Sequence, residues 1–347
     1  MSIESFVIEI IEGKKKVEAV RSILYGLSLF FHFGSYLRNK LYDIGLLYSV
    51  KLSKPVISIG NIVAGGTGKT PFVAMLGKHL SSKKIAIISR GYRSQGKGIR
   101  CVSKGEGPLL SAFEAGDEPY WLAKQLPAQV WVGKNRKKSS QQAILEGAEL
   151  LLLEDGFQHR QIKRNLDIVL LHAEDLWGRG YFLPRGYLRD LPQRLSSAHC
   201  IGVTYLDSNH NKGKIEQEIR RFSSAPIIGF SASYQGQEDR IQGKKVGLFC
   251  GIAKPNIFYR SVENLGAKIV QSLVIEDHKV SSEKELEAFA KECKDKGAEV
   301  LVCTEKDWVK LSFHERLALP VYVLQMQFVC VWNENLWHEL CQKMENL

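Results

Sequence analysis

The fold is decided by the stretch PVISIGNIVAGGTGKT at residues 55–70. Its first six residues predict a short buried strand, and the glycine-rich run after Gly60 predicts a loop. A helix follows from Pro71, a residue that the first helical turn tolerates. In such a strand–loop–helix unit, backbone N–H groups at the helix N-terminus point at phosphate oxygens. The sequence therefore predicts that nucleotide phosphates are bound by Gly65, Gly66, Thr67, Gly68, Lys69 and Thr70.

Two residues of this loop have predicted chemical roles. Lys69 would bridge the β- and γ-phosphates of a nucleotide, and Thr70 would ligate Mg²⁺. One position departs from the usual phosphate-binding loop, since Val63 stands where a glycine is common. The nearest upstream glycine is Gly60, so this loop is longer than the common form.

A second apolar strand, at residues 150–153, ends in Glu154 and Asp155. A carboxylate at the C-terminal end of a strand beside a phosphate-binding loop is what a Mg²⁺ site requires. We predict Asp155 as the direct or water-mediated metal partner, with Glu154 in support. A further strand at 85–89 leads to Arg90. The alternation of strands and helices predicts a doubly wound α/β sheet, in a P-loop NTPase-type α/β/α sandwich.

Composition narrows the class of protein. The 347-residue chain is globular in composition, and its seven scattered cysteines form no CxxC pair. Such cysteines are typical of reduced thiols in a cytosolic protein. The first 100 residues hold 16 Lys/Arg and 5 Asp/Glu, and so carry the whole net charge of +11. This imbalance indicates either an anionic surface or substrate for the N-terminal part, or a solvated basic face.

Residues 17–50 carry apolar side chains at three- and four-residue spacing, which predicts an amphipathic helix or helix pair. The apolar stretch at 23–33 is about half of the ~20 residues that a membrane-spanning helix needs. No secretory signal pattern fits, because charged residues precede the stretch and no cleavage site follows. The flanking basic residues suit a helix in the headgroup region of an anionic membrane. A helix packed on the protein's own core is an equal alternative.

Several further motifs follow one another along the chain. They are Gly60-Asn61, Ser89-Arg90-Gly91-Tyr92, Gly116-Asp117-Glu118-Pro119, Val132-Gly133 with Arg136, Glu154-Asp155-Gly156-Phe157-Gln158-His159, Leu183-Pro184 with Gly186, Leu188 and Arg189, Gly251-Ile252-Ala253, Asp277-His278 and Thr304-Glu305-Lys306-Asp307. In this ordered set, from about residue 25 to 311, the chain resembles the tetraacyldisaccharide 4′-kinases, the lipid A kinases of Gram-negative bacteria. The loop has this family's own form, which accounts for Val63.

The resemblance implies an ATP- and Mg²⁺-dependent kinase that acts on the 4′-hydroxyl of a tetraacylated glucosamine disaccharide 1-phosphate. It implies a peripheral enzyme on the cytoplasmic face of the inner membrane. No protein partner is implied, and nucleic acid is not expected as a partner because the chain shows no recognition motif for it. It also implies two α/β/α lobes, the second one smaller. We expect an amphipathic helical segment at 1–50 facing the membrane, a P-loop lobe at 51–222 and a C-terminal lobe at 223–347.

Phosphoryl transfer needs alignment, charge neutralisation and an acceptor for the hydroxyl proton. Asp117 is the candidate base, and the resemblance pairs it with His278 of the other lobe, so that the pair forms when the lobes close. The structural alternatives are a helix N-cap for Asp117 and an ordinary surface position for His278. The resemblance further implies that Asp190 is an acid on the metal side.

Five more residues are candidates for contact with substrate. Arg90, Arg136 and Arg189 could meet the phosphates of ATP or of the acceptor, because the planar guanidinium binds phosphate bidentately. Gln158 and His159 follow the acidic strand end. They are candidates for acceptor contact or for holding the nearby carboxylate, with a core or turn role as the alternative.

The chain departs from the family pattern at three positions. Glu154 stands where Asp is usual, and Arg185 replaces a small residue. Asp190 stands where Glu usually follows Arg189. The first 16 residues, through Lys16, are an extension that the resemblance does not explain.

Other P-loop functions fit less well. A GTPase needs a guanine-reading Asn-Lys-x-Asp motif, and at 304–307 the lysine stands one place too late. A kinase for a small soluble acceptor leaves the aromatic-rich N-terminal segment unexplained. A nucleic-acid-binding ATPase lacks a recognition motif, and a non-catalytic module would bind ATP without transferring phosphate.

Overall fold

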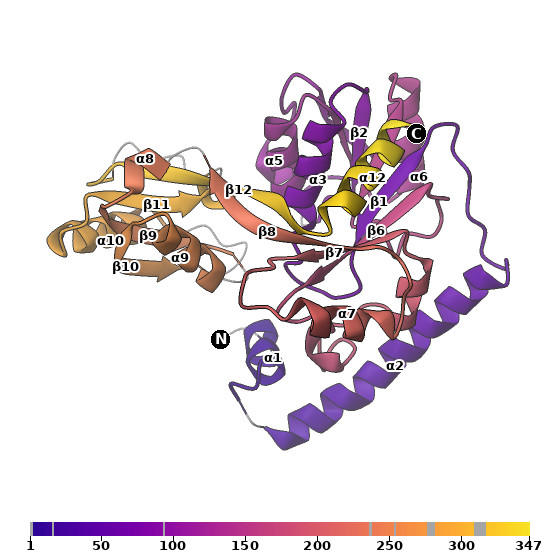
Figure 1. The fold of residues 1–347 in the computed structure, drawn as a ribbon, viewed down its shortest axis with the longest axis horizontal. Helices are drawn as coiled ribbons and strands as arrows, with labels where there is room; N and C mark the ends of the chain where they lie inside the picture. Colours follow the sequence, from indigo (N-terminus) through magenta and orange to yellow (C-terminus); the bar gives the residue numbers. More distant parts are fainter. Residues whose placement is uncertain are drawn as a thin grey trace. The chain divides into compact units, whose positions relative to one another are not determined.

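The predicted strand–loop–helix unit forms in the structure, a computed structural model (Figure 1). Strand β1 (Val56–Gly60) is fully buried and is followed, after the loop, by helix α3 (Lys69–His79). The structure describes residues 3–15, 17–92, 94–235, 238–252, 255–275, 282–308 and 317–347. The chain divides into two compact units, of which the first comprises Met1–Ser231 with Cys330–Leu347 and the second Ala232–Val329.

The sheet of the first unit is built around β1. Its strands, in sheet order, are β8 (Ile227–Gln235), β7 (Cys200–Thr204), β6 (Leu166–His172), β1, β5 (Leu150–Glu154), β2 (Ile85–Ser89), β4 (Gln129–Val132) and β3 (Arg100–Lys104). Neighbouring strands from β8 to β4 pair in parallel, and β3 pairs antiparallel with β4. Because β5 and β1 are parallel neighbours, the acids after β5 and the phosphate-binding loop leave the sheet at the same edge.

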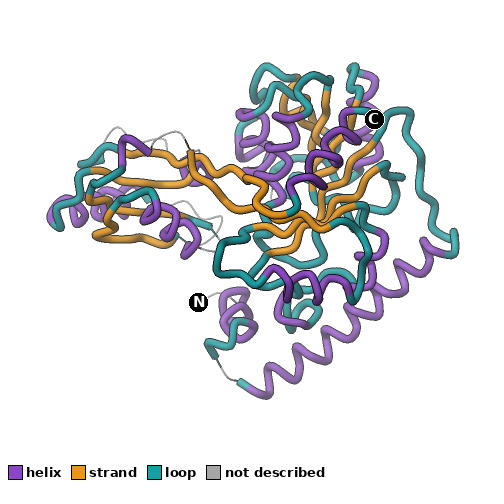
Figure 2. Tube along the Cα trace, viewed as in Figure 1, coloured by secondary structure: helices purple, strands orange, loops and turns teal. Residues whose placement is uncertain are grey.

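Helices cover both faces of this sheet (Figure 2). The described helices of the first unit are α1 (Ile3–Ile11), α2 (Glu18–Asp43), α3, α4 (Ala112–Ala115), α5 (Asp117–Gln125), α6 (Arg136–Leu145), α7 (Lys212–Arg220) and α12 (Glu334–Glu345), with 3-10 turns η1 (Gly178–Gly180) and η2 (Pro192–Ser197). On one face, Phe72 of α3 packs edge-on against Phe230 of β8 and Trp337 of α12. On the other, Ala143 of α6 packs with Val56. This is the predicted α/β/α sandwich.

At Gly60, the end of β1, the close packing of Phe157 leaves no room for a side chain. A Cβ atom added here would lie 2.5 Å from the Cβ of Phe157 and 2.7 Å from its backbone nitrogen. The missing side chain lets the turn after β5 lie directly against the start of the phosphate-binding loop.

The second unit is a smaller parallel sheet. Its strands, in sheet order, are β10 (Lys268–Val274), β9 (Lys245–Cys250), β11 (Val300–Thr304) and β12 (Val321–Trp332), and its described helices are α8 (Glu238–Ile241), α9 (Pro255–Asn264), α10 (Glu283–Asp295) and α11 (Glu305–Trp308). Asp307 accepts hydrogen bonds from the backbone N–H of Gly251 at 2.9 Å and the hydroxyl of Thr304 at 2.6 Å. The motif at 304–307 therefore fixes the loop after β9 within this unit.

The boundary between the units differs from the expected one at residue 223. The chain enters the second unit within β8 and returns within β12, so that α12 belongs to the first unit. The physical reason is the packing of Trp337 against Phe72 and Phe230. These residues are far apart in sequence, and no local pattern predicts their contact.

Most of the N-terminal segment forms one long helix, α2, which follows the shorter α1. Its buried residues are Leu24, Ser28, Ser35 and Asn39. Apart from Leu24, the buried side chains are thus small or polar, whereas many large apolar ones are exposed, among them Phe30 at 78% and Ile23 and Phe33 at 63%. Within the part of the chain that the structure describes, no helix combines the length and apolar content that crossing a membrane demands.

Candidate active site

The phosphate-binding loop is held in shape by its neighbours. Gly65 and Gly68 adopt φ angles of 115° and 76°, which favour glycine. The side-chain amide of Asn61 donates to Thr67 Oγ1 at 2.8 Å. Thr204 Oγ1, on β7, donates to the carbonyl of Thr67 at 3.0 Å. The first N–H groups of a helix lack acceptors within it, so this fixed loop and the start of α3 together suit phosphate oxygens.

Lys69 begins α3 beside the acidic end of β5. Its Nζ lies 3.5 Å from Oδ1 of Asp155. Burial lowers the pKa of Lys69, while the charge of Asp155 opposes this shift and the charge of Arg189 adds to it. The structure thus brings the predicted phosphate-bridging cation and the predicted metal-side carboxylate into one ion pair.

Glu154, the last residue of β5, is bonded to the start of α3 on one side and to the end of β2 on the other. Thr70 Oγ1 donates to one carboxylate oxygen at 3.0 Å, and Ser89 Oγ, at the end of β2, donates to the other. Burial raises the pKa of Glu154, the nearby charge of Glu118 raises it further, and the hydrogen bond from Ser89 lowers it. Glu154 is therefore directly joined to the predicted Mg²⁺ ligand Thr70.

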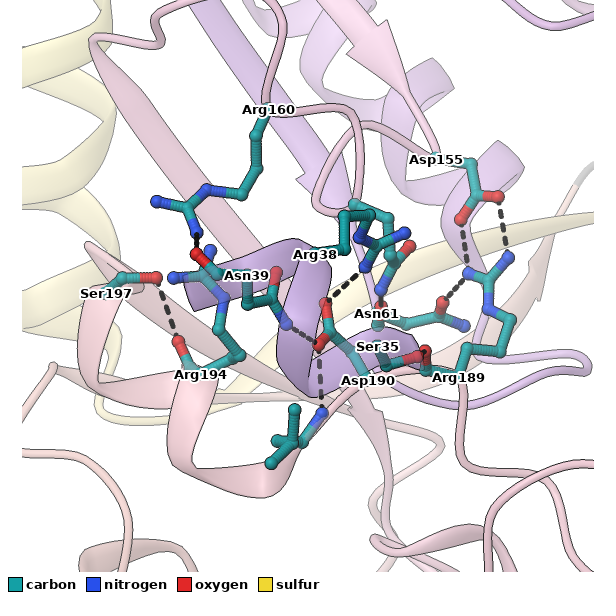
Figure 3. Close-up of polar contacts among 12 residues, drawn as sticks. Ser35, Arg38, Asn39, Asn61, Asp155, Arg160, Arg189, Asp190, Arg194 and Ser197 are labelled. Atoms are coloured by element: carbon teal, nitrogen blue, oxygen red, sulfur yellow. Dashed lines mark hydrogen bonds and ion pairs between the residues drawn. The ribbon is translucent and has the colours of Figure 1, made fainter. Parts of the chain in front are cut away.

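Asp155 follows β5 with a φ of 51°, and Arg189 binds its carboxylate (Figure 3). Nη1 and Nη2 of Arg189 lie 2.9 and 2.6 Å from its two oxygens, and Nη2 also bonds Asn61 Oδ1. Burial would raise the pKa of Asp155, but the charges of Lys69 and Arg189 hold this pKa well below its usual range. Asp155 is consequently ionised at neutral pH.

The other two arginines singled out from the sequence have different positions. Arg136, at the start of α6, is only 4% exposed, and its Nη1 donates to the backbone carbonyl of Asp155 at 2.8 Å. Burial lowers the pKa of Arg136, and the positive charge of Arg90 contributes to this shift. Arg90 itself is exposed, directly after β2. Arg136 thus supports the acidic turn, and Arg90 is the more accessible of the two to a phosphate.

Gln158 and His159 lie on the turn after the acids. Gln158 Nε2 donates to the backbone carbonyl of Asn61 at 2.7 Å, which ties this turn to the phosphate-binding loop. Burial, with the charge of Arg136, lowers the pKa of His159 to about 4, so its imidazole is neutral at pH 7. Its Nε2 is buried and has no hydrogen-bond partner among the described residues. A neutral imidazole can bind a hydroxyl group of an acceptor.

Asp117 is the first residue of α5, and Gly116 occupies the N-cap position before it. The alternative that Asp117 is itself the N-cap is therefore wrong. The charge of the next residue, Glu118, acts on Glu154, so the start of α5 lies near the acidic end of β5. His278 lies outside the described residues, and its pairing with Asp117 stays a prediction.

Asp190 is not part of this cluster. Its carboxylate is fully buried and accepts hydrogen bonds from Asn39 Nδ2 at 2.6 Å and from the backbone N–H of Leu191 at 3.0 Å. Nη2 of Arg38, also on α2, lies 3.5 Å from the other oxygen. Figure 3 shows the neighbouring side chains of Arg189 and Asp190 diverging, the first toward the acids and the second toward α2. The contacts of Asp190 are thus with α2, and its place at the metal site stays a prediction.

Comparison with known proteins gives the family of this fold and site. The profile of the tetraacyldisaccharide-1-P 4′-kinase family matches residues 20–345. The chain belongs to this family. It is 36% identical over 348 residues to the tetraacyldisaccharide 4′-kinase of Syntrophus aciditrophicus (strain SB), covering 93% of each chain. It is 34% identical over 316 residues to that of Chlamydia muridarum (strain MoPn / Nigg), covering 85% of this chain and 84% of the relative.

A solved structure is similar over nearly the whole chain. It is the crystal structure of LpxK from Aquifex aeolicus in complex with ATP. The two chains are 30% identical, with a TM-score of 0.76, and the match covers 94% of this chain and 99% of that one.

A kinase of this family implies a divalent cation with ATP, and the residues at the site fit Mg²⁺. Thr70, Glu154 and Asp155 offer the hydroxyl and carboxylate oxygens that Mg²⁺ prefers. Among the described residues, no group of three or more His, Cys, Asp or Glu could hold a metal by itself. Mg²⁺ is usually bound by one or two carboxylates together with substrate phosphates, which agrees with this donor set.

Two residues of the site were assigned no role from the sequence. Asn61 joins Thr67 to Arg189, and Ser89 holds Glu154. Both stand at the carboxyl end of a parallel strand, Asn61 directly after β1 and Ser89 at the end of β2. Polar residues at that edge of an α/β sheet gather around the ligand, and this position is the signal that could have identified them.

Proposed function

We propose that this protein transfers the γ-phosphate of ATP to the 4′-hydroxyl of a tetraacyldisaccharide 1-phosphate, a step of lipid A biosynthesis. The observation that carries the proposal is the convergence of Lys69, Thr70, Glu154 and Asp155 at one sheet edge, in a chain of the tetraacyldisaccharide-1-P 4′-kinase family. The similar protein of Aquifex aeolicus, crystallised with ATP, supports ATP as the donor.

In the proposed reaction the acceptor oxygen attacks the γ-phosphorus. One P–O bond forms, the bond from this phosphorus to the β-phosphate oxygen breaks, and ADP leaves. Lys69 bridges the β- and γ-phosphates, and Asp117 accepts the hydroxyl proton. Mg²⁺, when bound, neutralises further phosphate charge, and Thr70, Glu154 and Asp155 would hold it.

Asp155 also prepares the site for ATP. Its carboxylate holds Lys69 at 3.5 Å and Arg189 at 2.6 Å, so the protein's own acid orients both cations. Phosphate oxygens bind the same donors. ATP therefore meets groups that are already oriented, which reduces the cost of assembling the site.

Helix α2 is the proposed membrane contact. Its exposed residues include Phe30 and Phe33, and three of its four buried residues are small or polar. A helix with this arrangement, with the exposed basic residue Lys40 alongside, suits the headgroup region of an anionic bilayer. We place the protein on the cytoplasmic face of the inner membrane, as a peripheral enzyme that reaches a four-chain lipid at the bilayer surface.

A mostly apolar groove of about 530 Å³ lies beside this face. Its lining residues are Leu29, His32, Phe33, Tyr36, Leu191 and Gln193. Four of the six are on α2, and Leu191 follows the Arg189–Asp190 pair. The groove therefore lies between the proposed membrane contact and the chain segment that holds Asp155, and we propose an acyl chain of the acceptor as its occupant.

The proposal is tested by transfer of label from γ-³²P-ATP to tetraacyldisaccharide 1-phosphate in detergent–lipid micelles. Wild-type protein is expected to label the lipid, and Lys69→Ala and Asp117→Ala are expected to lose transfer. Loss in Lys69→Ala alone would keep the kinase and reject Asp117 as the base. ATP hydrolysis without lipid labelling would reject the lipid acceptor and favour a soluble one.

A further inference from the structure

The polar face of α2 is bonded to a two-residue segment that also reaches the nucleotide site. On one side of this segment, Asn39 donates to Asp190 and Arg38 pairs with it; we call these three residues the α2 clamp. Asp190 is 0% exposed, so these partners take the place of water around its carboxylate. On the other side, the guanidinium of Arg189 binds Asp155 and Asn61 (Figure 3).

The backbone of the same segment is fixed from both directions. The N–H groups of Arg189 and Asp190 donate to the carbonyl of Ile62, in the phosphate-binding loop, at 2.8 and 3.3 Å. The carbonyl of Arg189 accepts from Ser35 Oγ, on α2, at 3.4 Å. A displacement of Asp190 would therefore be transmitted to Arg189 and to the start of the loop through covalent and hydrogen bonds.

Helix α2 has other attachments that do not involve Asp190, one of which, Arg160, also donates to the backbone carbonyl of Asn39 at 2.9 Å. Arg160 donates to Asp43 Oδ1 at 2.7 Å, and the ring of His32 stacks on Phe182 with centroids 4.6 Å apart. Removal of the clamp's hydrogen bond would thus leave the helix docked. The clamp is consequently more than an anchor for the helix: it joins α2 to the residue that orients the metal-side acid.

We infer that Asn39, through Asp190, is a positioning residue for phosphoryl transfer that keeps Arg189 on Asp155. The inference rests on the proposed kinase function. Under this inference α2 has a second role besides its proposed contact with lipid. Residues on the inward face of α2 set the geometry of the nucleotide site. Catalytic groups displaced by about 1 Å lose up to 100-fold in rate, so a contact outside the reaction centre can control the transfer rate.

The test compares three variants in mixed micelles. Asn39→Ala removes the hydrogen bond to Asp190. Asp43→Ala removes an anchor of α2 that does not touch Asp190, leaves the side-chain hydrogen bond of Asn39 in place, and serves as the matched control. The reciprocal swap, Asn39→Asp with Asp190→Asn, restores an amide–carboxylate hydrogen bond in the opposite direction. Thermal melts establish that each variant is folded.

Asn39→Ala is expected to lower kcat about tenfold, because it removes one buried hydrogen bond to a charged group. The KM for the lipid is expected to stay within about twofold of the wild-type value. Asp43→Ala should retain the wild-type kcat, and the swap should recover most of the lost rate. An equal fall in kcat for Asp43→Ala would overturn the inference, because the clamp would then only dock the helix. A raised lipid KM with unchanged kcat, or a swap no faster than Asn39→Ala, would overturn it as well.

A binding measurement separates this inference from the proposed function. With a fluorescent ATP analogue and Mg²⁺ but no lipid, Asn39→Ala is expected to weaken the Kd about threefold, and Asp43→Ala to leave it unchanged. If the wild type labels no lipid, the proposed kinase function fails, and the inference then depends on this Kd. Equal Kd values for wild type and Asn39→Ala would in that case reject the clamp.

Discussion

Replacement of Arg189 by Gln isolates the contribution of the guanidinium to the site. Arg189 makes two hydrogen bonds to the carboxylate of Asp155, at 2.9 and 2.6 Å, and both side chains are about one quarter exposed. A hydrogen bond to a charged group contributes about 1.5–3 kcal/mol, and the partial exposure favours the lower value for each. Loss of both costs about 3 kcal/mol. If this free energy is lost from the stabilisation of the transition state, the transfer rate decreases about 100-fold.

The pH dependence of the variant gives an independent signature. A carboxylate with a depressed pKa keeps its charge at neutral pH and loses it only as the pH falls through that low pKa. In the wild type, Lys69 and Arg189 hold the pKa of Asp155 well below its usual range against burial. Without Arg189, burial is less opposed and the pKa rises. The acid limb of the kcat/KM profile is therefore expected to move to higher pH.

The assay is ³²P transfer to the lipid, with rates measured from pH 5 to 9. Arg185→Gln is the matched control, because Arg185 lies on the same chain segment and stacks over Tyr181 at 4.5 Å instead of contacting the acids. The control should keep the wild-type rate and profile. A rate for Arg189→Gln within about threefold of wild type, with an unmoved acid limb, would refute the proposed role of the Arg189–Asp155 pair.

Three further predictions concern other parts of the molecule. Gly60→Ala places a methyl group 2.5 Å from the Cβ of Phe157 and should lower the free energy of unfolding by about 1–3 kcal/mol in a urea titration; an unchanged midpoint would contradict the packing argument. Ser89→Ala removes a hydrogen bond to Glu154 and should raise the Mg²⁺ concentration for half-maximal transfer several-fold. An unchanged Mg²⁺ concentration would show that Glu154 plays no part in holding the ion. Phe30→Ser alters a side chain that is 78% exposed, so it should leave the melting temperature nearly unchanged while weakening co-sedimentation with anionic vesicles; equal co-sedimentation would argue against α2 as the membrane contact.

The features that could be predicted from the sequence are those encoded locally. The apolar runs before Asn61 and Glu154 predict buried strands, and the glycines between Gly60 and Lys69 predict the phosphate-binding loop. Each depends on residues within about ten positions of one another. For the same reason the helical spacing of the N-terminal segment correctly predicts a helix there.

The features that could not be predicted depend on long-range contacts. Asp190 follows Arg189 directly, and sequence alone does not show that its partner, Asn39, lies 151 positions earlier on α2. Arg136 resembles any exposed arginine until its bond to the backbone of Asp155 is known. The return of α12 to the first unit is of the same kind, because Trp337 finds its partners on elements formed much earlier in the chain.

The central claim, phosphorylation of one hydroxyl of an acylated disaccharide, is tested most directly by the structure of the product. Wild-type protein is incubated with ATP, Mg²⁺ and tetraacyldisaccharide 1-phosphate, and the lipid is analysed by ³¹P NMR and tandem mass spectrometry. We expect the lipid to gain one phosphate, present as a second monoester on the 4′-position of the distal sugar, and to gain none with Lys69→Ala. An unchanged lipid, or a diphosphate at the 1-position, would contradict it.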